Sequence, residues 1–176
     1  MDRRTFTCLG LLAVLSATLC LAPVATASPR HEARVMLGAK LYFAATLSEP
    51  SGQACADCHQ PFAGYADPEQ GLPVSEGVVS GRFGGRNAPS AAYMGKSPVL
   101  HQADGVWVGG AFWDGRASGW TDRRPLVEQA KGPFLNPGEM NNVSKAQVVR
   151  DVKRSRYAPL FIAVYGRHAF ADPEQA

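Results

Sequence analysis

The sequence predicts an all-α domain in which long loops are organised by a bound group. Segments with helical periodicity lie near both ends of the chain, whereas residues 60–110 between them are rich in glycine and proline. A loop region of that length is uncommon in a compact domain unless it surrounds a ligand. The motif Cys55-Ala56-Asp57-Cys58-His59, just before this region, indicates where such a ligand is attached.

The motif has the residue types and the spacing of a c-type haem attachment site. Each thiol can form a thioether with one haem vinyl group, and the histidine can bind the iron as proximal ligand. The alternatives are a zinc half-site, a redox dithiol and a structural disulfide. A zinc site usually has a second ligand pair at similar spacing, and a thioredoxin-like motif lies in a βαβ pattern that the flanking residues lack. We therefore expect a cytochrome c-like domain with its Gly/Pro-rich loops wrapped round one covalently bound haem c, attached through Cys55 and Cys58 and ligated by His59.

Residues 1–27 have the features of a signal peptide. A short basic region with Arg3 and Arg4 precedes an apolar run over residues 6–22, and Ala25-Thr26-Ala27 offers a cleavage site. Cleavage there leaves residues 28–176 as one haem domain, which we expect to be periplasmic and to have no membrane span. Export agrees with the haem prediction, because c-type haem is attached outside the bacterial cytoplasm.

The charge of the chain is nearly balanced. Its formal net charge is +3 at pH 7, and two of its arginines lie in the predicted signal peptide. We therefore expect neither nucleic acid nor an anionic membrane surface as a partner.

Apolar periodicity and end signals predict four helices besides a one-turn helix at the haem motif. These four cover residues 33–47, 126–130, 144–154 and 159–166. Pro125 and Pro159 suit the first turn of a helix. Ser144 and Gln147 form a capping box, and Gly166 is a stop signal. The residues after Gly166 are expected to be a polar tail.

Six stretches resemble a known family when they are taken as an ordered set. They are Leu37-Gly38-Ala39-Lys40-Leu41-Tyr42-Phe43, the haem motif with Pro61 and Asp67, Gly85-Arg86-Asn87-Ala88-Pro89-Ser90, Phe112-Trp113-Asp114-Gly115-Arg116-Ala117, Glu128-Gln129-Ala130, and Gly132-Pro133-Phe134-Leu135-Asn136-Pro137-Gly138-Glu139-Met140. The chain resembles the bacterial di-haem cytochrome c peroxidases and their MauG-like relatives. The resemblance covers residues 35–166, but only the N-terminal half of such a protein.

The resemblance implies a haem-dependent peroxidase that reduces hydrogen peroxide with electrons from a small donor protein, a cytochrome c or a cupredoxin. In that family the N-terminal haem meets the peroxide and a second haem takes in the electrons. This sequence has no second Cys-x-x-Cys-His motif. We therefore expect either a truncated protein or a partner chain that carries the second haem.

Three residues match catalytic positions of the family. Glu139 matches the distal acid–base glutamate, Gln129 matches the glutamine that orients peroxide, and Trp113 matches the tryptophan between the two haems. Taken without the resemblance, the three residues are more simply a turn residue, a surface helix residue and a core aromatic residue.

Two further roles concern the loops. Asn87 matches a ligand of the calcium ion that the family binds at its domain junction, and an oxygen ligand on a glycine-rich loop suits calcium. Asp114 and Arg116 are expected to form a buried charge pair that holds their loop in place.

One position departs from the family pattern and leaves two functions open. Many of these peroxidases have a histidine that caps the resting haem where this chain has Val78, and valine cannot bind iron. An open haem favours the peroxidase. The alternative is a mono-haem c-type cytochrome that only transfers electrons, with Met94, Met140 or His101 as the second axial ligand.

Overall fold

The computed structural model describes residues 28–69 and 71–173. The predicted signal peptide, residues 1–27, lies outside the described residues. The elements are α1 (Pro29–Tyr42), α2 (Cys55–Cys58), β1 (His101–Ala103), β2 (Val106–Val108), α3 (Pro125–Leu135), α4 (Lys145–Arg154) and α5 (Ala158–Tyr165), with short 3-10 turns at Ala45–Leu47, Pro61–Ala63 and Met94–Lys96. In the described part of the chain, no helix is long and apolar enough to cross a bilayer.

The helices follow local signals, with shifts at their ends. Ser28 caps α1 by accepting a hydrogen bond from the backbone N–H of His31 at 3.3 Å, so this helix begins before residue 33 and ends at Tyr42. Helix α3 runs beyond its predicted end to Leu135. Helices α4 and α5 have nearly the predicted limits, because Ser144 caps the first and Gly166, at a φ of 96°, follows the second.

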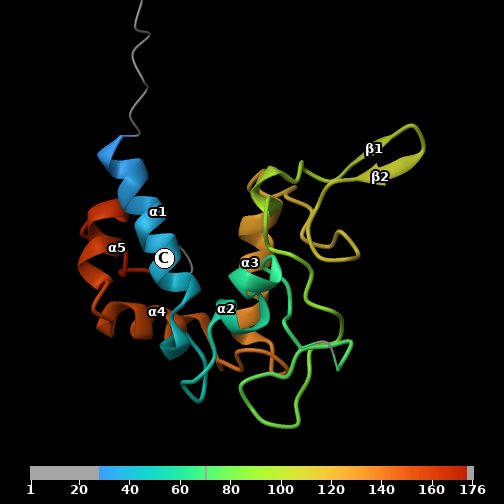
Figure 1. The fold of residues 1–176 in the computed structure, drawn as a ribbon. Coiled ribbons are helices and arrows are strands. Elements are labelled where there is room, and N and C mark those ends of the chain that lie inside the picture. Colours follow the sequence, from blue (N-terminus) through green and yellow to red (C-terminus); the bar gives the residue numbers. More distant parts are fainter. Residues whose placement is uncertain (1–27, 70, 174–176) are drawn as a thin grey trace, which may run out of the picture.

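The prediction of an all-α fold was wrong in one respect, because β1 and β2 form a two-stranded antiparallel sheet. Asp104 and Gly105 connect the strands with φ values of 50° and 79°. Two successive residues with positive φ make the turn that suits a tight hairpin, and Asp-Gly is a favoured pair there. The fold is therefore helix-rich with one small hairpin, which projects away from the helices (Figure 1).

The hydrophobic core lies among α1, α4 and α5, which stand together on one side of the molecule (Figure 1). Its buried members are Leu37, Ala44, Leu47, Met140, Val152, Tyr157, Phe161 and Val164. Part of the predicted polar tail belongs to it as well: Phe170 stacks on Phe161 with ring centroids 4.9 Å apart. That part of the tail is therefore not a solvated end.

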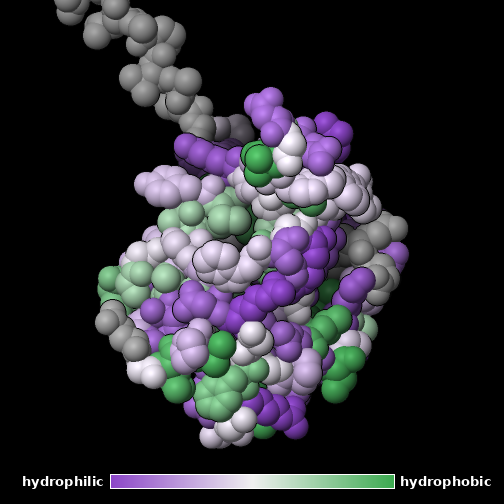
Figure 2. All heavy atoms as spheres, turned by 90° about the vertical axis from the view of Figure 1, so that its right-hand side faces the viewer, coloured by the Kyte–Doolittle hydropathy of each residue, from purple (hydrophilic) through white to green (hydrophobic). Residues whose placement is uncertain are grey.

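The glycine- and proline-rich region has no comparable core. None of the described residues from 60 to 109 is buried, and large side chains such as Phe62 and Tyr93 are more than 80% exposed. Figure 2, which faces the side of the molecule with the loops and hairpin, shows apolar patches scattered among polar groups. This region cannot gain much stability from its own apolar contacts.

We predict that a haem-free variant loses order in this region and keeps it in the helical core. In Cys55→Ala/Cys58→Ala, backbone amides of residues 60–109 are expected to exchange with solvent much faster than in the haem-loaded protein. Amides of α1 and α5 serve as the internal control and should keep most of their protection. Hydrogen exchange followed by mass spectrometry measures both. Equal protection of the loops with and without haem would contradict the prediction.

Candidate functional site

The one-turn helix α2 brings the two cysteines of the motif onto one side. Cys55 and Cys58 are its first and last residues, and residues three apart on a helix are neighbours. The carboxylate of Asp57 accepts a hydrogen bond from the backbone N–H of Ala54 at 2.7 Å, which stabilises the start of the turn. The backbone N–H of His59 donates to the carbonyl of Cys55 at 3.0 Å. The local fold thus presents both thiols and the histidine from one short segment.

The state of the two thiols distinguishes among the alternatives for this motif. Both cysteines are free and partly buried. Burial raises the pKa of both thiols, and that of Cys58 to about 11, whereas a reactive redox dithiol has a lowered pKa. Within residues 28–69 and 71–173, no group of three His, Cys, Asp or Glu residues is arranged to hold a metal ion. These features do not favour a redox dithiol, and the attachment of haem through both thiols stays a prediction.

His59 is oriented as a haem ligand should be. Its Nδ1 lies 3.0 Å from the carbonyl oxygen of Pro89 and 3.3 Å from that of Tyr65. A carbonyl can only accept, so Nδ1 carries the proton and Nε2 has the free electron pair that a metal needs. A hydrogen bond from the other ring nitrogen to a carbonyl is the usual outer-shell support of a metal-binding histidine.

Glu139 lies beside the haem motif, and its catalytic role stays a prediction. Its carboxyl group is close enough to interact electrostatically with Cys58 and His59. Burial raises the pKa of this carboxyl group, although a hydrogen bond from Asn136 and the charges of His59 and Arg116 act the other way. Asn136 donates that bond from Nδ2 to Oε1 at 2.7 Å.

Close backbone contacts position the segment that carries Glu139. The N–H of Val78 donates to the carbonyl of Glu139 at 2.9 Å. A Cβ added to Gly77 would lie 2.5 Å from the carbonyl oxygen of Gly138, and one added to Gly138 would lie 2.5 Å from that of Phe83. Only glycine fits at both places. The stretch in which the family pattern has its capping histidine therefore lies directly against the backbone of Glu139.

Gln129 and its neighbour Glu128 lie on α3. Gln129 is half-buried and makes no hydrogen bond to Glu139. The carboxylate of Glu128 accepts from the backbone N–H groups of Gly119 at 2.9 Å and Thr121 at 3.3 Å. Glu128 therefore holds the loop before α3, a role that sequence reasoning missed. The catalytic role of Gln129 stays a prediction.

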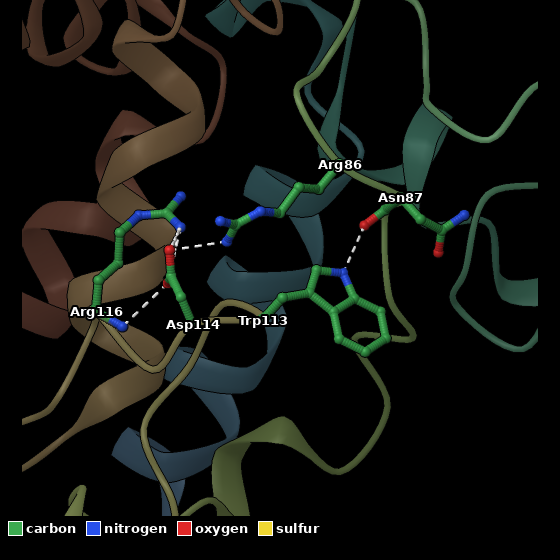
Figure 3. A network of polar contacts seen from close by, with 5 residues as sticks. All are labelled: Arg86, Asn87, Trp113, Asp114 and Arg116. Atoms are coloured by element: carbon green, nitrogen blue, oxygen red, sulfur yellow. Dashed lines mark hydrogen bonds and ion pairs between the residues drawn. The ribbon is translucent and has the colours of Figure 1, made fainter.

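Trp113 and Asn87, which the sequence assigned to different roles, are in contact (Figure 3). The indole Nε1–H of Trp113 donates to the backbone carbonyl of Asn87 at 2.9 Å. Trp113 is 64% exposed, so the reading of it as a core aromatic residue is wrong for this chain. The side chain of Asn87 is exposed too, and its role as a calcium ligand remains a prediction.

The expected pair of Asp114 and Arg116 exists, but it is not buried. Arg116 lies 2.9 Å from the Asp114 carboxylate and Arg86 lies 2.8 Å from it (Figure 3). The side chains of Asp114 and Arg116 are 39% and 55% exposed. The guanidinium of Arg86, followed by groups of Arg116, holds the pKa of Asp114 at about 2. This network joins two loops, and Arg116 also lies over the ring of Phe112 at 3.6 Å.

Sequence reasoning also missed Tyr42, whose hydroxyl donates to the carbonyl of His59. The residue lies inside one of the recognised motifs, but nothing in its spacing indicates a partner so far along the chain. Its ring packs edge-on against Tyr65 with centroids 6.2 Å apart. Tyr42 and Tyr65 therefore form a small aromatic cluster beside the proximal histidine.

Comparison with known proteins decides the family. The family model for di-haem cytochrome c peroxidases matches residues 32–176. The chain belongs to this family. It is 37% identical over 172 residues to the methylamine utilization protein MauG of Paracoccus denitrificans and 33% identical over 144 residues to the cytochrome c peroxidase Ccp of Escherichia coli. The crystal structure of the diheme peroxidase BthA from Burkholderia thailandensis matches with a TM-score of 0.71 at 35% identity.

This member of the di-haem peroxidase family spans less than half the length of these relatives. The matched regions cover 89%, 81% and 80% of the chain, but only 43% of MauG, 26% of Ccp and 34% of BthA. The chain corresponds to their N-terminal portion. Membership implies haem c as the cofactor, in agreement with the orientation of His59 and its two neighbouring thiols.

We predict that Gly77→Ala destabilises this domain, because the added methyl group meets backbone that cannot move aside. The free energy of unfolding should fall by about 1–3 kcal/mol, as is typical of overpacking. Gly85→Ala is the matched control, since a Cβ at Gly85 meets nothing within 4 Å. Denaturant titration of the haem-loaded proteins measures both. A Gly77→Ala protein as stable as the control would contradict the close contact described above.

Proposed function

We propose that the chain is a haem-dependent peroxidase domain that reduces hydrogen peroxide to water with electrons from a small redox protein. Cys55, Cys58 and His59 would hold one covalent haem. When bound, the haem supplies an iron centre at which the O–O bond of peroxide is cleaved. The observation that best supports the proposal is the partly buried carboxyl group of Glu139, which lies beside the haem motif and has a raised pKa.

Glu139 would move the proton that peroxide cleavage requires. Its carboxylate takes a proton from the incoming peroxide and returns it to the leaving oxygen, which departs as water. The hydrogen bond from Asn136 engages Oε1, so Oε2 is available for this exchange. A pKa above the ordinary carboxyl value makes Glu139 a better proton acceptor and brings it nearer the pH at which it works.

Gln129 and Trp113 would assist this reaction in two ways. From α3, the amide of Gln129 orients peroxide or the water that replaces it. Trp113 carries electrons toward the haem from a partner that bears a second haem, and its exposed indole is accessible to such a partner. Val78 offers no imidazole to compete with peroxide for the iron. The domain would work in the periplasm after removal of residues 1–27.

The alternative function, electron transfer alone, has less support in the structure. It requires a second protein ligand on the iron. Met140 is 4% exposed and belongs to the hydrophobic core with Leu37. Its side chain is therefore packed in the core and is not free to bind iron. His101 lies on the exposed hairpin, with its Nδ1 2.8 Å from the carbonyl oxygen of Val99. That bond leaves Nε2 of His101 free, as at His59, so His101 and the half-buried Met94 keep the possibility open.

We predict that Glu139→Gln slows the reaction of the ferric protein with peroxide by about a hundred- to ten-thousand-fold, the usual contribution of general acid–base catalysis. The resting optical spectrum should remain high-spin and nearly unchanged. Glu32→Gln, an exposed change on α1, is the control and should react like the unmodified protein. Stopped-flow mixing with peroxide measures the rates. A low-spin ferric spectrum that does not respond to cyanide would refute the peroxidase function.

The same residue should set the acid side of the pH profile. Glu139 must be ionised to accept a proton, so the rate should rise with pH as its carboxyl group deprotonates. Because the pKa of this group is raised from 4.5, the half-maximal rate should lie above that pH. In Glu139→Gln this limb should disappear. A limb that persists in the variant would assign the titration to another group.

A further inference from the structure

We propose that a groove between α1 and α4 is the docking site of a small acidic one-electron redox protein, which reduces the haem through Tyr42 and His59. The inference rests on the proposed function, because it requires the haem on His59 and an external donor. It goes beyond that function by naming the surface, the charge of the partner and the route of the electron.

The α1/α4 groove is lined partly by exposed apolar side chains. Its volume is about 790 Å³, and its lining includes Met36 from α1, Phe43 directly after this helix and Tyr157 from the segment after α4. Met36 and Phe43 are 54% and 58% exposed. In Figure 1, α4 lies near the end of α1 at which these residues occur. An exposed apolar centre of this kind suits the core of a protein interface, which excludes water.

The charges around the groove are mostly positive. Lys40, Arg154 and Arg156 line it together with a single carboxylate, that of Asp151. Among the described residues, none of these three cations forms an ion pair. Apolar side chains beside unpaired cations complement a partner with an apolar patch and carboxylates around it. Such complementarity increases the association rate and selects the partner.

A short chain of contacts connects this groove to the proximal histidine. The ring of Phe43 packs edge-on against Tyr42 with centroids 5.2 Å apart. The hydroxyl of Tyr42 donates a hydrogen bond to the carbonyl of His59. A donor seated at Phe43 is thus separated from the ligand residue by one side chain and one hydrogen bond.

The proposed step is a simple electron transfer. One electron leaves the metal centre of the donor, which is oxidised by one unit, and reduces the haem iron from ferric to ferrous. No bond of the protein is broken and no proton is transferred. This route does not pass through Trp113.

The test is the reduction of the ferric protein by a plant-type [2Fe–2S] ferredoxin, an acidic one-electron donor of low potential. In Lys40→Glu/Arg154→Glu, the second-order rate at low ionic strength should fall at least tenfold. Lys131→Glu/Arg167→Glu changes the net charge equally at exposed positions outside the groove, and its rate should stay within about twofold of the unmodified protein. At about 1 M salt, where charges are screened within about 3 Å, all three rates should converge.

Two further measurements separate docking from damage to the haem. Dithionite, a small reductant, should reduce all the proteins at the same rate. Tyr42→Phe should bind ferredoxin with the same salt dependence but show a several-fold lower limiting rate, because the hydrogen bond to His59 is lost. A limiting rate unchanged by Tyr42→Phe would overturn the route.

The remaining outcomes overturn either this inference or the proposed function, and they can be told apart. Equal losses in the groove and control variants would show that only net charge matters and would refute the site. A wild-type dimer in sedimentation that Lys40→Glu/Arg154→Glu dissociates would assign the groove to a second copy of the chain. If reduction by ferredoxin depends on the groove while peroxide fails to react, docking stands and the peroxidase function falls.

Discussion

The hydrogen bond from His59 to the carbonyl of Pro89 joins the haem motif to a loop thirty residues further along the chain. It acts on a region that has few other sources of order, since no described residue from 60 to 109 is buried. A protein segment becomes ordered only when its contacts offset the loss of conformational entropy. Here those contacts are mainly hydrogen bonds. Besides that of His59, a few of them reach distant residues, such as the bond from Val78 to the carbonyl of Glu139 and that from Arg86 to Asp114. The ring that would bind iron is also the group that holds the loop, so haem binding and loop order are expected to depend on each other.

The segment that carries Glu139 is fixed by contacts that also stabilise the fold. The next residue, Met140, is buried in the core, and its carbonyl accepts a hydrogen bond from the N–H of Glu49 at 2.9 Å. On the other side, Gly77 and Gly138 approach so closely that no side chain fits between their backbones. The carboxyl group is therefore held between a packed core and a backbone contact, although its own segment is neither helix nor strand. This arrangement gives a catalytic group a defined position at the edge of an otherwise loosely packed region.

The features that could be predicted are those with local causes. The cysteine motif, the cap at Ser144 and the stop at Gly166 each depend on residues a few positions apart. The hairpin also had a local signal in Asp104-Gly105, but its three-residue strands are too short to show alternation. The pairing of Arg86 with Asp114, by contrast, joins loops that are 28 residues apart. No periodicity encodes such a contact, and for the same reason the exposure of this charge network could not be inferred from the sequence.

Trp113 is 64% exposed, yet its indole is fixed by the carbonyl of Asn87, and the loop that carries it is linked through Asp114 to Arg86. A large aromatic side chain that is both held in place and open to solvent is well suited to contact another protein, because little conformational entropy remains to be lost on binding. The α1/α4 groove is lined by residues of two helices and includes Phe43, which packs on Tyr42, whereas Trp113 lies on a loop. If both proposals hold, a partner with a second haem and a soluble electron donor would use different surfaces and would not compete. A substitution that blocks one route would then be expected to leave the other intact.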